Sequence, residues 1–398
     1  MIPVPMVPPG RQGAAWPADP LLPPSPSTEL RPCRRRVLAW LAAGLAGTGA
    51  AARAADAGPV PPPSAGAIGS ALQRPAVSTA LGARSVLQGA AQAGRRLVAV
   101  GERGLILVSS DDGQSWQQRP CPVSTGLTAV RFADDLHGVA VGHGGVVLST
   151  QDGGQQWRLV LEGLQAARLE REAARARGDA AALRSAERLV ADGADKPWLD
   201  VLTSAPGRLL AVGAYGLALA SGDGGLTWTS WRDRLDNPRE LHLYGVRQRG
   251  ERLLIAGEQG LVLLSGDGGR SFRRLVLPYA GSFFTAELPP DGSLVVAGLR
   301  GNTWRSTDGG ASWQALAAPV PVSIVASALA PDGALLLASQ AGQVLRAAPG
   351  ELALRALPLP PQPPLTGLLP LAGGRLLTLS ILGARRLSLS DAVAPAPH

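Results

Sequence analysis

The chain has 398 residues, 45% of them hydrophobic and 17% charged, which is enough apolar material for a sizeable buried core. Its formal net charge is +8, but half of that excess lies in residues 1–54, which excludes the clustered basic face of a typical nucleic-acid-binding domain. Fifty glycines and 35 prolines predict many turns and few long helices.

Residues 1–54 are predicted to be an N-terminal extension that carries an export signal. The positive stretch RPCRRR (31–36) precedes an apolar, small-residue run (37–52) and an Ala-Arg-Ala cleavage pattern (52–54). The apolar run is short, so we expect cleavage and release into the periplasm, by the Sec or the twin-arginine route, rather than a membrane anchor. Because a signal normally starts a chain, we also expect the true start codon to lie further along than Met1.

Cysteine content limits the disulfide and metal chemistry of the mature protein, and composition indicates its domain bounds. Cys33 lies in the signal, so only Cys121 remains, which rules out an intramolecular disulfide and a cysteine-based zinc site. Residues 55–73 form a Pro/Ala-rich linker, residues 74–392 the folded domain and residues 393–398 a short tail.

Almost the same octapeptide occurs five times after the linker. The copies are SSDDGQSW (109–116), TQDGGQQW (150–157), SGDGGLTW (221–228), SGDGGRSF (265–272) and STDGGASW (306–313). Each copy follows an apolar run and a G-x-x-G turn, and two weaker units follow the fifth copy.

The second glycine of each G-x-x-G turn measures the repeat. These glycines are Gly104, Gly145, Gly216, Gly260, Gly301, Gly342 and Gly383. Their spacings are 41, 71, 44, 41, 41 and 41 residues, which gives seven units of about 41 residues with one insertion of 30. Periods of 40–50 residues with several short strands per unit are typical of β-propeller blades.

Each unit is predicted to contain four antiparallel strands, named A to D in chain order. In the second unit these are residues 127–133, 138–142, 146–150 and 157–162, with G-x-x-G as the tight hairpin between B and C. The predicted fold is therefore all-β, a seven-bladed β-propeller of four-stranded antiparallel blades.

The octapeptide forms the C–D turn of each blade, and we predict a structural role for it. Its Asp accepts backbone hydrogen bonds, its glycines adopt positive φ, and its aromatic residue packs near the blade edge. The residues concerned are Asp111, Asp152, Asp223, Asp267, Asp308, Trp116, Trp157, Trp228, Phe272 and Trp313.

Closure of the ring is predicted from the two ends of the domain. The seventh unit lacks a fourth strand, whereas residues 74–81 form a spare segment before the first unit. Our hypothesis is that residues 74–81 supply the outer strand of blade seven and leave no unpaired edge.

The insertion falls between the second and third blades, within residues 161–195. Residues 164–178 and 179–193 are rich in helix formers, with Asp179 as an N-cap and Gly193 as a C-terminal stop. They predict a helical hairpin, with Leu183, Ala186 and Val190 on one face of the second helix. It either packs on its own blade or serves as a docking arm.

The repeated phrase resembles the Asp-box, or BNR, repeat of sialidase-like propellers. The seven-unit pattern, with VGHGGVVLST (141–150), DKPWLDVL (195–202), DRLDNPRELHLYGV (233–246) and GLRGNTWRSTDGGASW (298–313), resembles the photosystem II stability and assembly factor family, as found in non-photosynthetic proteobacteria. The resemblance covers roughly residues 70–390. It implies a periplasmic or lumenal propeller without catalysis that assists assembly of membrane-protein complexes, and outside photosynthesis it suggests an inner-membrane transporter as the client. We expect no cofactor and no metal.

A binding site is expected on the propeller face that carries the B–C tips and the D–A connections, because loops on a rigid scaffold commonly carry function. The candidate partner-binding residues are Arg103, His143, Tyr215, Arg232, Arg234, His242, Tyr244, Gln259, Tyr279, Phe283, Phe284 and Arg300. The same residues admit structural roles, in which Arg103 and Arg300 are solvated tips, His143 caps a turn, and Phe283 and Phe284 pack against the next blade.

Two other functions stay open at this point. A sialidase-like glycoside hydrolase would use Tyr215 or Tyr244 with Glu258 or Asp233, and a lectin would bind sugar without turnover. The repeats show no specialised pocket, so we favour a monomeric protein-binding scaffold with no catalytic residues, no small-molecule substrate and no nucleic-acid partner.

Overall fold

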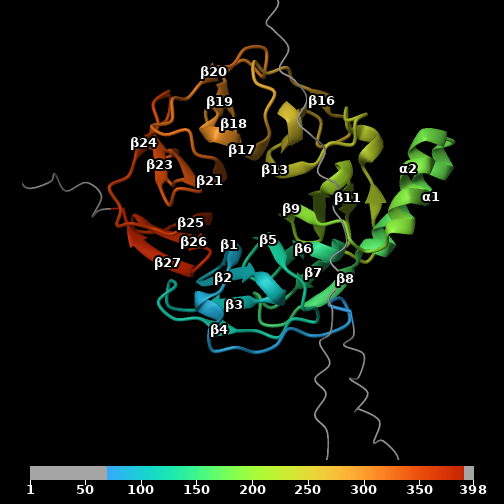
Figure 1. Ribbon diagram of the computed structural model, residues 1–398, viewed down its shortest axis with the longest axis horizontal. Coiled ribbons are helices and arrows are strands. Elements are labelled where there is room, and N and C mark those ends of the chain that lie inside the picture. Colours follow the sequence, from blue (N-terminus) through green and yellow to red (C-terminus); the bar gives the residue numbers. More distant parts are fainter. Residues whose placement is uncertain (1–69, 390–398) are drawn as a thin grey trace, which may run out of the picture. The chain divides into compact units, whose positions relative to one another are not determined.

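A computed structural model describes residues 70–389. The export signal, most of the linker, the last residues of the predicted domain and the tail lie outside the described residues. Within 70–389 the chain is mostly β-structure, and seven antiparallel sheets follow one another around a ring (Figure 1). We number them sheet 1 to sheet 7 in chain order.

The first four sheets contain β1 (Leu87–Ala93), β2 (Arg96–Gly101), β3 (Ile106–Ser109), β4 (Gln117–Gln118); β5 (Leu127–Phe132), β6 (Gly138–Gly142), β7 (Val147–Thr150), β8 (Arg158–Leu161); β9 (Trp198–Ala205), β10 (Arg208–Gly213), β11 (Ala218–Ser221), β12 (Thr229–Ser230); and β13 (Leu243–Arg249), β14 (Arg252–Gly257), β15 (Val262–Ser265), β16 (Arg273–Arg274). The last three contain β17 (Phe283–Glu287), β18 (Leu294–Gly298), β19 (Thr303–Ser306), β20 (Gln314–Ala315); β21 (Ile324–Leu329), β22 (Leu335–Ser339), β23 (Val344–Ala347), β24 (Arg355–Ala356); and β25 (Leu365–Leu371), β26 (Arg375–Ser380), β27 (Gly383–Ser388).

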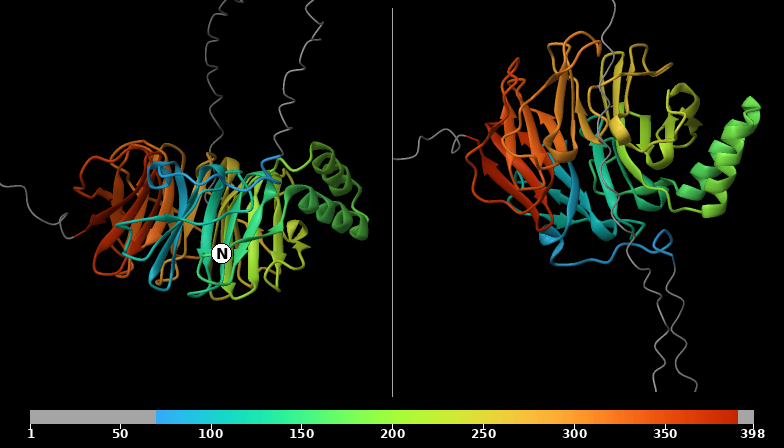
Figure 2. Two further views of the ribbon diagram at one scale, coloured as in Figure 1. Left: turned by 90° about the horizontal axis from the view of Figure 1, so that it is seen from below. Right: turned by 45° about the horizontal axis from the view of Figure 1, so that its top comes forward.

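Every sheet is a meander whose strands follow chain order from the hub to the rim. The first strand of each sheet lines a central cavity, and the second strand is almost wholly buried between neighbouring sheets. In the six four-stranded sheets, the outermost strand is short, only two residues long in all but sheet 2. The ring is flat, and the two α-helices lie at its rim (Figure 2).

The G-x-x-G turns are tight hairpins, as the repeat predicts, and in the first five of them two residues adopt positive φ. In the first turn the Glu102 carbonyl accepts a hydrogen bond from Leu105 N–H at 2.9 Å, and both Arg103 (φ 53°) and Gly104 (φ 73°) are left-handed. This pattern belongs to the mirror-image hairpin turns that suit strand twist. Tyr215, Gln259 and Arg300 occupy the same strained position as Arg103.

The octapeptide forms the turn at the opposite end of sheets 1 to 5, and its Asp is fully engaged there. In the third copy the Ser221 hydroxyl donates to Asp223 Oδ1 at 2.8 Å, and the Thr227 hydroxyl donates to Oδ2 at 2.6 Å. Hydrogen bonds from the hydroxyl and N–H of Thr227, and from Ser221, lower the pKa of Asp223 to about 2. These carboxylates hold the turn closed and have little capacity left for a ligand.

The aromatic residue that ends each octapeptide packs into the core between its own sheet and the preceding one. Trp157 joins sheets 1 and 2, Trp228 joins sheets 2 and 3, and Phe272 joins sheets 3 and 4. The last glycine of the box, such as Gly310, sits so close to the preceding sheet that an added Cβ would lie 2.6 Å from Leu275. The octapeptide is therefore both a turn and a spacer between sheets.

Ring closure differs from the sequence-based hypothesis. Residues 74–81 form no strand; they run along sheet 1, where Gln118 bonds Val77 O and Thr79 N. Sheet 7 has three strands, so the hypothesis that residues 74–81 complete it is wrong. Sheets 7 and 1 instead meet through a leucine-rich cluster: Leu87, Leu97, Ala99, Leu105, Leu107, Leu371, Leu377 and Leu379. Side-chain packing between faces closes the ring.

The insertion forms two helices, α1 (Gly163–Arg177) and α2 (Ala180–Asp192), between β8 and β9. Asp179 caps α2, since its Oδ1 accepts hydrogen bonds from Ala181 N and Ala182 N at 3.0 Å. Apolar residues of both helices, including Ala166 and Leu189, join the core cluster of sheets 2 and 3. The helices therefore pack on the propeller rim. No helix within residues 70–389 is long and apolar enough to cross a membrane.

One carboxyl group lies in the contact between α1 and sheet 3. Glu170 is 1% exposed, its Oε2 accepts a hydrogen bond from the Ser230 hydroxyl at 2.9 Å, and its Oε1 lacks a partner within the described chain. Burial raises the pKa of Glu170 to about 7, although Arg232 and Ser230 lower it in part.

The buried Glu170 carboxyl predicts that the free energy of unfolding depends on pH. Because its pKa is higher in the folded chain than in the unfolded chain, the free energy of unfolding should decrease as pH rises from about 4.5 to about 7, by up to about 3 kcal/mol. Glu170→Gln should remove this dependence and raise the melting temperature at pH 8. Thermal unfolding at pH 5 and pH 8 measures it, with exposed Glu172→Gln as the control. An unchanged pH profile in Glu170→Gln would contradict the assignment.

Candidate binding face and central cavity

One face of the ring carries the B–C tips together with the ends of the connections between sheets; we call it the tip face. At each sheet the backbone holds the two together: Glu102 N–H donates to Val86 O at 3.1 Å, and Glu258 N–H donates to His242 O at 2.9 Å. The grouping of loops that the sequence predicts is therefore present, and the octapeptide turns lie at the other end of the strands.

Four of the predicted residues form a continuous aromatic row on this face. The ring of Tyr215, at the tip of sheet 3, lies 5.1 Å from that of His242, which lies 6.2 Å from Tyr244. Tyr244 in turn meets Phe284 at 5.3 Å, and all three contacts are edge-on. Tyr244 and Phe284 line the central cavity, so the row extends from an exposed tip to the mouth of the hub.

Neighbouring groups fix the outer end of this row. Tyr215 N–H donates to His242 Nδ1 at 2.8 Å, and Lys196 Nζ lies 4.9 Å from the centre of the Tyr215 ring. Arg232 donates to the Tyr215 carbonyl at 3.1 Å and pairs with Glu240 at 2.7 Å. Arg232 thus holds the Tyr215 tip through its carbonyl, and the Arg232 guanidinium is already engaged by protein partners.

The structure separates other predicted residues from the row. Phe283 is fully buried in the core of sheets 4 and 5, because alternate side chains of β17 face opposite ways, so its prediction as a surface contact is wrong. Arg234 donates to Gly269 O of an octapeptide turn at 3.1 Å and covers Trp231, so it does not belong to the tip face either. Tyr279 packs on Phe283 and donates to Leu299 O.

The remaining predicted residues lie on separate tips of the same face. Arg103, His143, Gln259 and Arg300 are all exposed. Gln259 is contacted by Arg239, whose Nη2 donates to Gln259 Oε1 at 2.5 Å. They lie on the tips of sheets 1, 2, 4 and 5, and none of the ring contacts of the aromatic row involves them.

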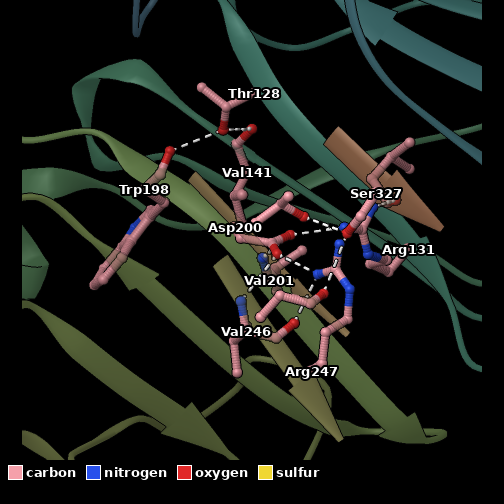
Figure 3. Close-up of polar contacts among 12 residues, drawn as sticks. Thr128, Arg131, Val141, Trp198, Asp200, Val201, Val246, Arg247 and Ser327 are labelled. Carbon is pink, nitrogen blue, oxygen red and sulfur yellow. Dashed lines mark hydrogen bonds and ion pairs between the residues drawn. The ribbon is translucent and has the colours of Figure 1, made fainter. Parts of the chain in front are cut away.

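The hub holds a cavity of about 880 Å³, lined by the innermost strands of all seven sheets. A network of charged and hydroxyl side chains crosses one side of it (Figure 3). Asp200 pairs with Arg131 at 2.9 Å and with Arg247 at 2.7 Å, and Arg247 also pairs with Glu287 at 3.3 Å. The Ser327 hydroxyl continues the network by donating to Glu287 Oε1 at 2.8 Å.

Electrostatics favour the ionised form of this network. Burial alone would raise the pKa of Asp200, but Arg131, Arg247 and two backbone N–H groups hold it below its usual value. Burial alone would lower the pKa of Arg247, but Glu287 and Asp200 raise it. The network links one residue from each of sheets 2 to 6 at the hub. Its two arginines and two carboxylates have no net charge, so it offers no excess charge to an ionic ligand.

Sequence reasoning missed this network, although a signal was present. Arg131, Arg247 and Glu287 occupy the same position of the innermost strand in three different repeats, since their strands pair with the next strand in equivalent register. The other side of the cavity is lined mainly by apolar residues of sheets 6, 7 and 1, among them Val325, Leu365 and Leu368. The cavity wall is thus polar on one side and apolar on the other.

Comparisons with known proteins show similarity to YCF48 proteins. Residues 182–351 match a family model described as photosynthesis system II assembly factor YCF48. The search of characterised protein sequences gave no significant match. A structure of YCF48 bound to a D1 peptide superimposes with a TM-score of 0.56 at 16% identity, covering 78% of this chain and 97% of that one.

Two further structures show the breadth of the fold likeness. YCF48 from Cyanidioschyzon merolae gives a TM-score of 0.56 at 15% identity, covering 76% of this chain and 95% of that chain. The GH74 xyloglucanase from Xanthomonas campestris gives 0.58 at 16% identity, covering 80% of this chain but only 54% of that enzyme. Likenesses at such identities establish the propeller fold. With the family-model match, they confirm the resemblance to photosystem II assembly factors.

Proposed function

We propose that this YCF48-like chain is an exported, non-catalytic, seven-bladed propeller that binds a segment of an inner-membrane protein on its tip face. Binding would assist the assembly or stability of the partner's complex, and a transporter is the client that the family resemblance suggests. The aromatic row Tyr215–His242–Tyr244–Phe284 is the observation that carries the proposal. Aromatic anchors that lead into a cavity are the usual energetic centre of protein interfaces.

The strained tips support a binding role for this face. Tyr215, Gln259, Arg103 and Arg300 all hold positive φ, where glycine would cost less. Each such residue costs about 1 kcal/mol or more. Side chains at strained positions are commonly found at functional sites, and here one of them, Tyr215, is the outer end of the aromatic row.

The carboxylates that a hydrolase would need are engaged elsewhere, which favours a scaffold. Glu258 Oε2 accepts a hydrogen bond from His242 N–H at 3.2 Å, and Asp233 pairs with Arg177 of α1 at 3.7 Å. The YCF48 structure solved with a D1 peptide supports a peptide segment as the partner here.

We expect Tyr244→Ala combined with Phe284→Ala to reduce recovery of the partner at least tenfold, since central aromatic anchors are each worth about 2 kcal/mol. Affinity capture from membranes of the source cells, followed by quantitative mass spectrometry, measures the recovery. Leu226→Ala is the matched control, because Leu226 is 79% exposed on an octapeptide turn at the opposite end of sheet 3. Equal recovery by the double variant and the wild type, both folded, would remove the aromatic row from the binding site.

A further inference from the structure

The helical insertion stands next to one particular tip of the ring. Its two helices lie beside sheet 3, with α1 against β12 (Figure 1). At the tip of sheet 3 the residue before the last glycine is aromatic, Tyr215. The other six tips have no aromatic residue there: Arg103, Gly144, Gln259, Arg300, Ala341 and Leu382. The insertion therefore accompanies the tip that begins the aromatic row.

Helix α2 reaches the backbone of this tip through two residues of the connection between β12 and β13. Ser185, which is buried on α2, donates from its hydroxyl to Glu240 Oε2 at 2.8 Å. Glu240 Oε1 pairs with Arg232 at 2.7 Å, and Arg232 donates to the Tyr215 carbonyl at 3.1 Å. A hydroxyl, a carboxylate and a guanidinium thus form a chain of charge-assisted contacts from the helix to the tip.

The end of α2 reaches the Tyr215 ring by a second route. Asp192, the last residue of α2, accepts a hydrogen bond from Lys196 Nζ at 2.9 Å, and Asp195 accepts another from the same atom. The Lys196 ammonium lies 4.9 Å from the centre of the Tyr215 ring, a distance at which a cation attracts an aromatic face. The carbonyl and the ring of Tyr215 are thus both connected to α2.

Helix α1 holds the segment that carries Arg232. Glu170 Oε2 accepts a hydrogen bond from the Ser230 hydroxyl at 2.9 Å, and Ser230 Oγ accepts one from Arg232 N–H at 3.2 Å. Arg177, the last residue of α1, pairs with Asp233 at 3.7 Å. Arg232 therefore receives support from both helices, although it lies outside the insertion.

We infer that the helical insertion is a brace that positions Tyr215 for partner binding, with Ser185, Glu240 and Arg232 as its positioning residues. Tyr215 is 45% exposed and has a φ of 56°, a conformation that persists only where surrounding contacts hold it. A tip that is already held loses less conformational freedom when a partner binds, which raises affinity. The inference rests on the proposed function of the tip face and assigns the insertion a role in that site.

Hydrogen exchange at the tip tests the brace without any partner. Arg232→Met and Ser185→Ala should each speed amide exchange of residues 214–217, by about tenfold for Arg232→Met, because a charge-assisted hydrogen bond to the tip is lost. Arg232→Lys should restore part of the protection, and Glu187→Ala, at an exposed position of α2, should exchange as wild type. Exchange in residues 208–212 of β10 should stay unchanged in every variant. Unchanged exchange at the tip in both Arg232→Met and Ser185→Ala would overturn the brace.

Partner recovery tests whether the position of the tip matters for binding. In affinity capture from membranes, Arg232→Met should lower recovery of the partner about threefold or more, and Glu187→Ala should leave it unchanged. Faster tip exchange with full recovery in Arg232→Met, beside reduced recovery when Tyr244 and Phe284 are both changed to Ala, would overturn the inference. Full recovery in that double variant would instead remove the proposed binding site, while tip exchange would still decide whether the insertion holds Tyr215.

Discussion

Arg247→Met is expected to destabilise the propeller by about 3–5 kcal/mol, because it leaves two buried carboxylates, Asp200 and Glu287, without their shared cation. Both acids have little exposure, 4% and 7%, so removal of the arginine leaves two poorly solvated charges. Denaturant-induced unfolding at neutral pH measures the loss. Arg249→Met is the control on the same strand, since Arg249 is exposed.

Two further results would separate an ionic network from simple packing. Because the pKa of Asp200 is lowered in the fold, its contribution is present above its unfolded pKa of about 4 and is lost as pH falls below that value. Asp200→Asn should flatten this acid dependence, and the double variant Asp200→Asn with Arg247→Met should cost less than the two single changes added. A loss below about 1 kcal/mol for Arg247→Met would show that the network does not hold the hub.

Leu377→Ala is expected to destabilise the chain by about 2–5 kcal/mol, since Leu377 is fully buried where sheets 7 and 1 close the ring. Its side chain also lies beside Gly113 of the first octapeptide, so its removal leaves a cavity on both sides of the junction. Thermal unfolding compared with Leu382→Ala, which changes a residue 67% exposed at the tip of sheet 7, measures the effect.

The same measurement distinguishes face packing from strand exchange as the means of closure. Deletion of residues 70–81 removes the segment along sheet 1 but leaves the leucine cluster intact. We therefore expect the deletion to lower the melting temperature less than Leu377→Ala does. The opposite order would restore a closing role for the N-terminal segment.

The fold could be predicted from the sequence because each repeat carries its own local signals. The G-x-x-G tips and the octapeptides mark the two ends of sheets 1 to 5, and their spacing gives the strand lengths between them. Closure could not be predicted in the same way. Residues 74–81 and β27 lie at opposite ends of the domain sequence. No local sequence pattern predicts that leucines of sheets 7 and 1 fill the space between these two sheets.

The binding face could be predicted in outline and not in detail. The order of the loops predicts that Tyr215, His242, Tyr244 and Phe284 lie on one face, and in the structure their rings are in contact. All four lie in, or directly after, loops at the same end of the sheets. It could not separate Phe284 from its buried neighbour Phe283, since that depends on the strand register. The hub network was missed because its partners come from different repeats and meet only when the ring is closed.

Site-specific photo-crosslinking tests the central proposal most directly. A benzophenone amino acid at position 215, on the tip face, or at position 226, on an octapeptide turn, would be activated in intact source cells. The account predicts one recurring adduct with an inner-membrane protein from position 215, lost when Tyr244 and Phe284 are changed to Ala, and none from position 226. The same adduct from position 226, or persistence of the adduct in the double variant, would contradict a partner held on the aromatic row.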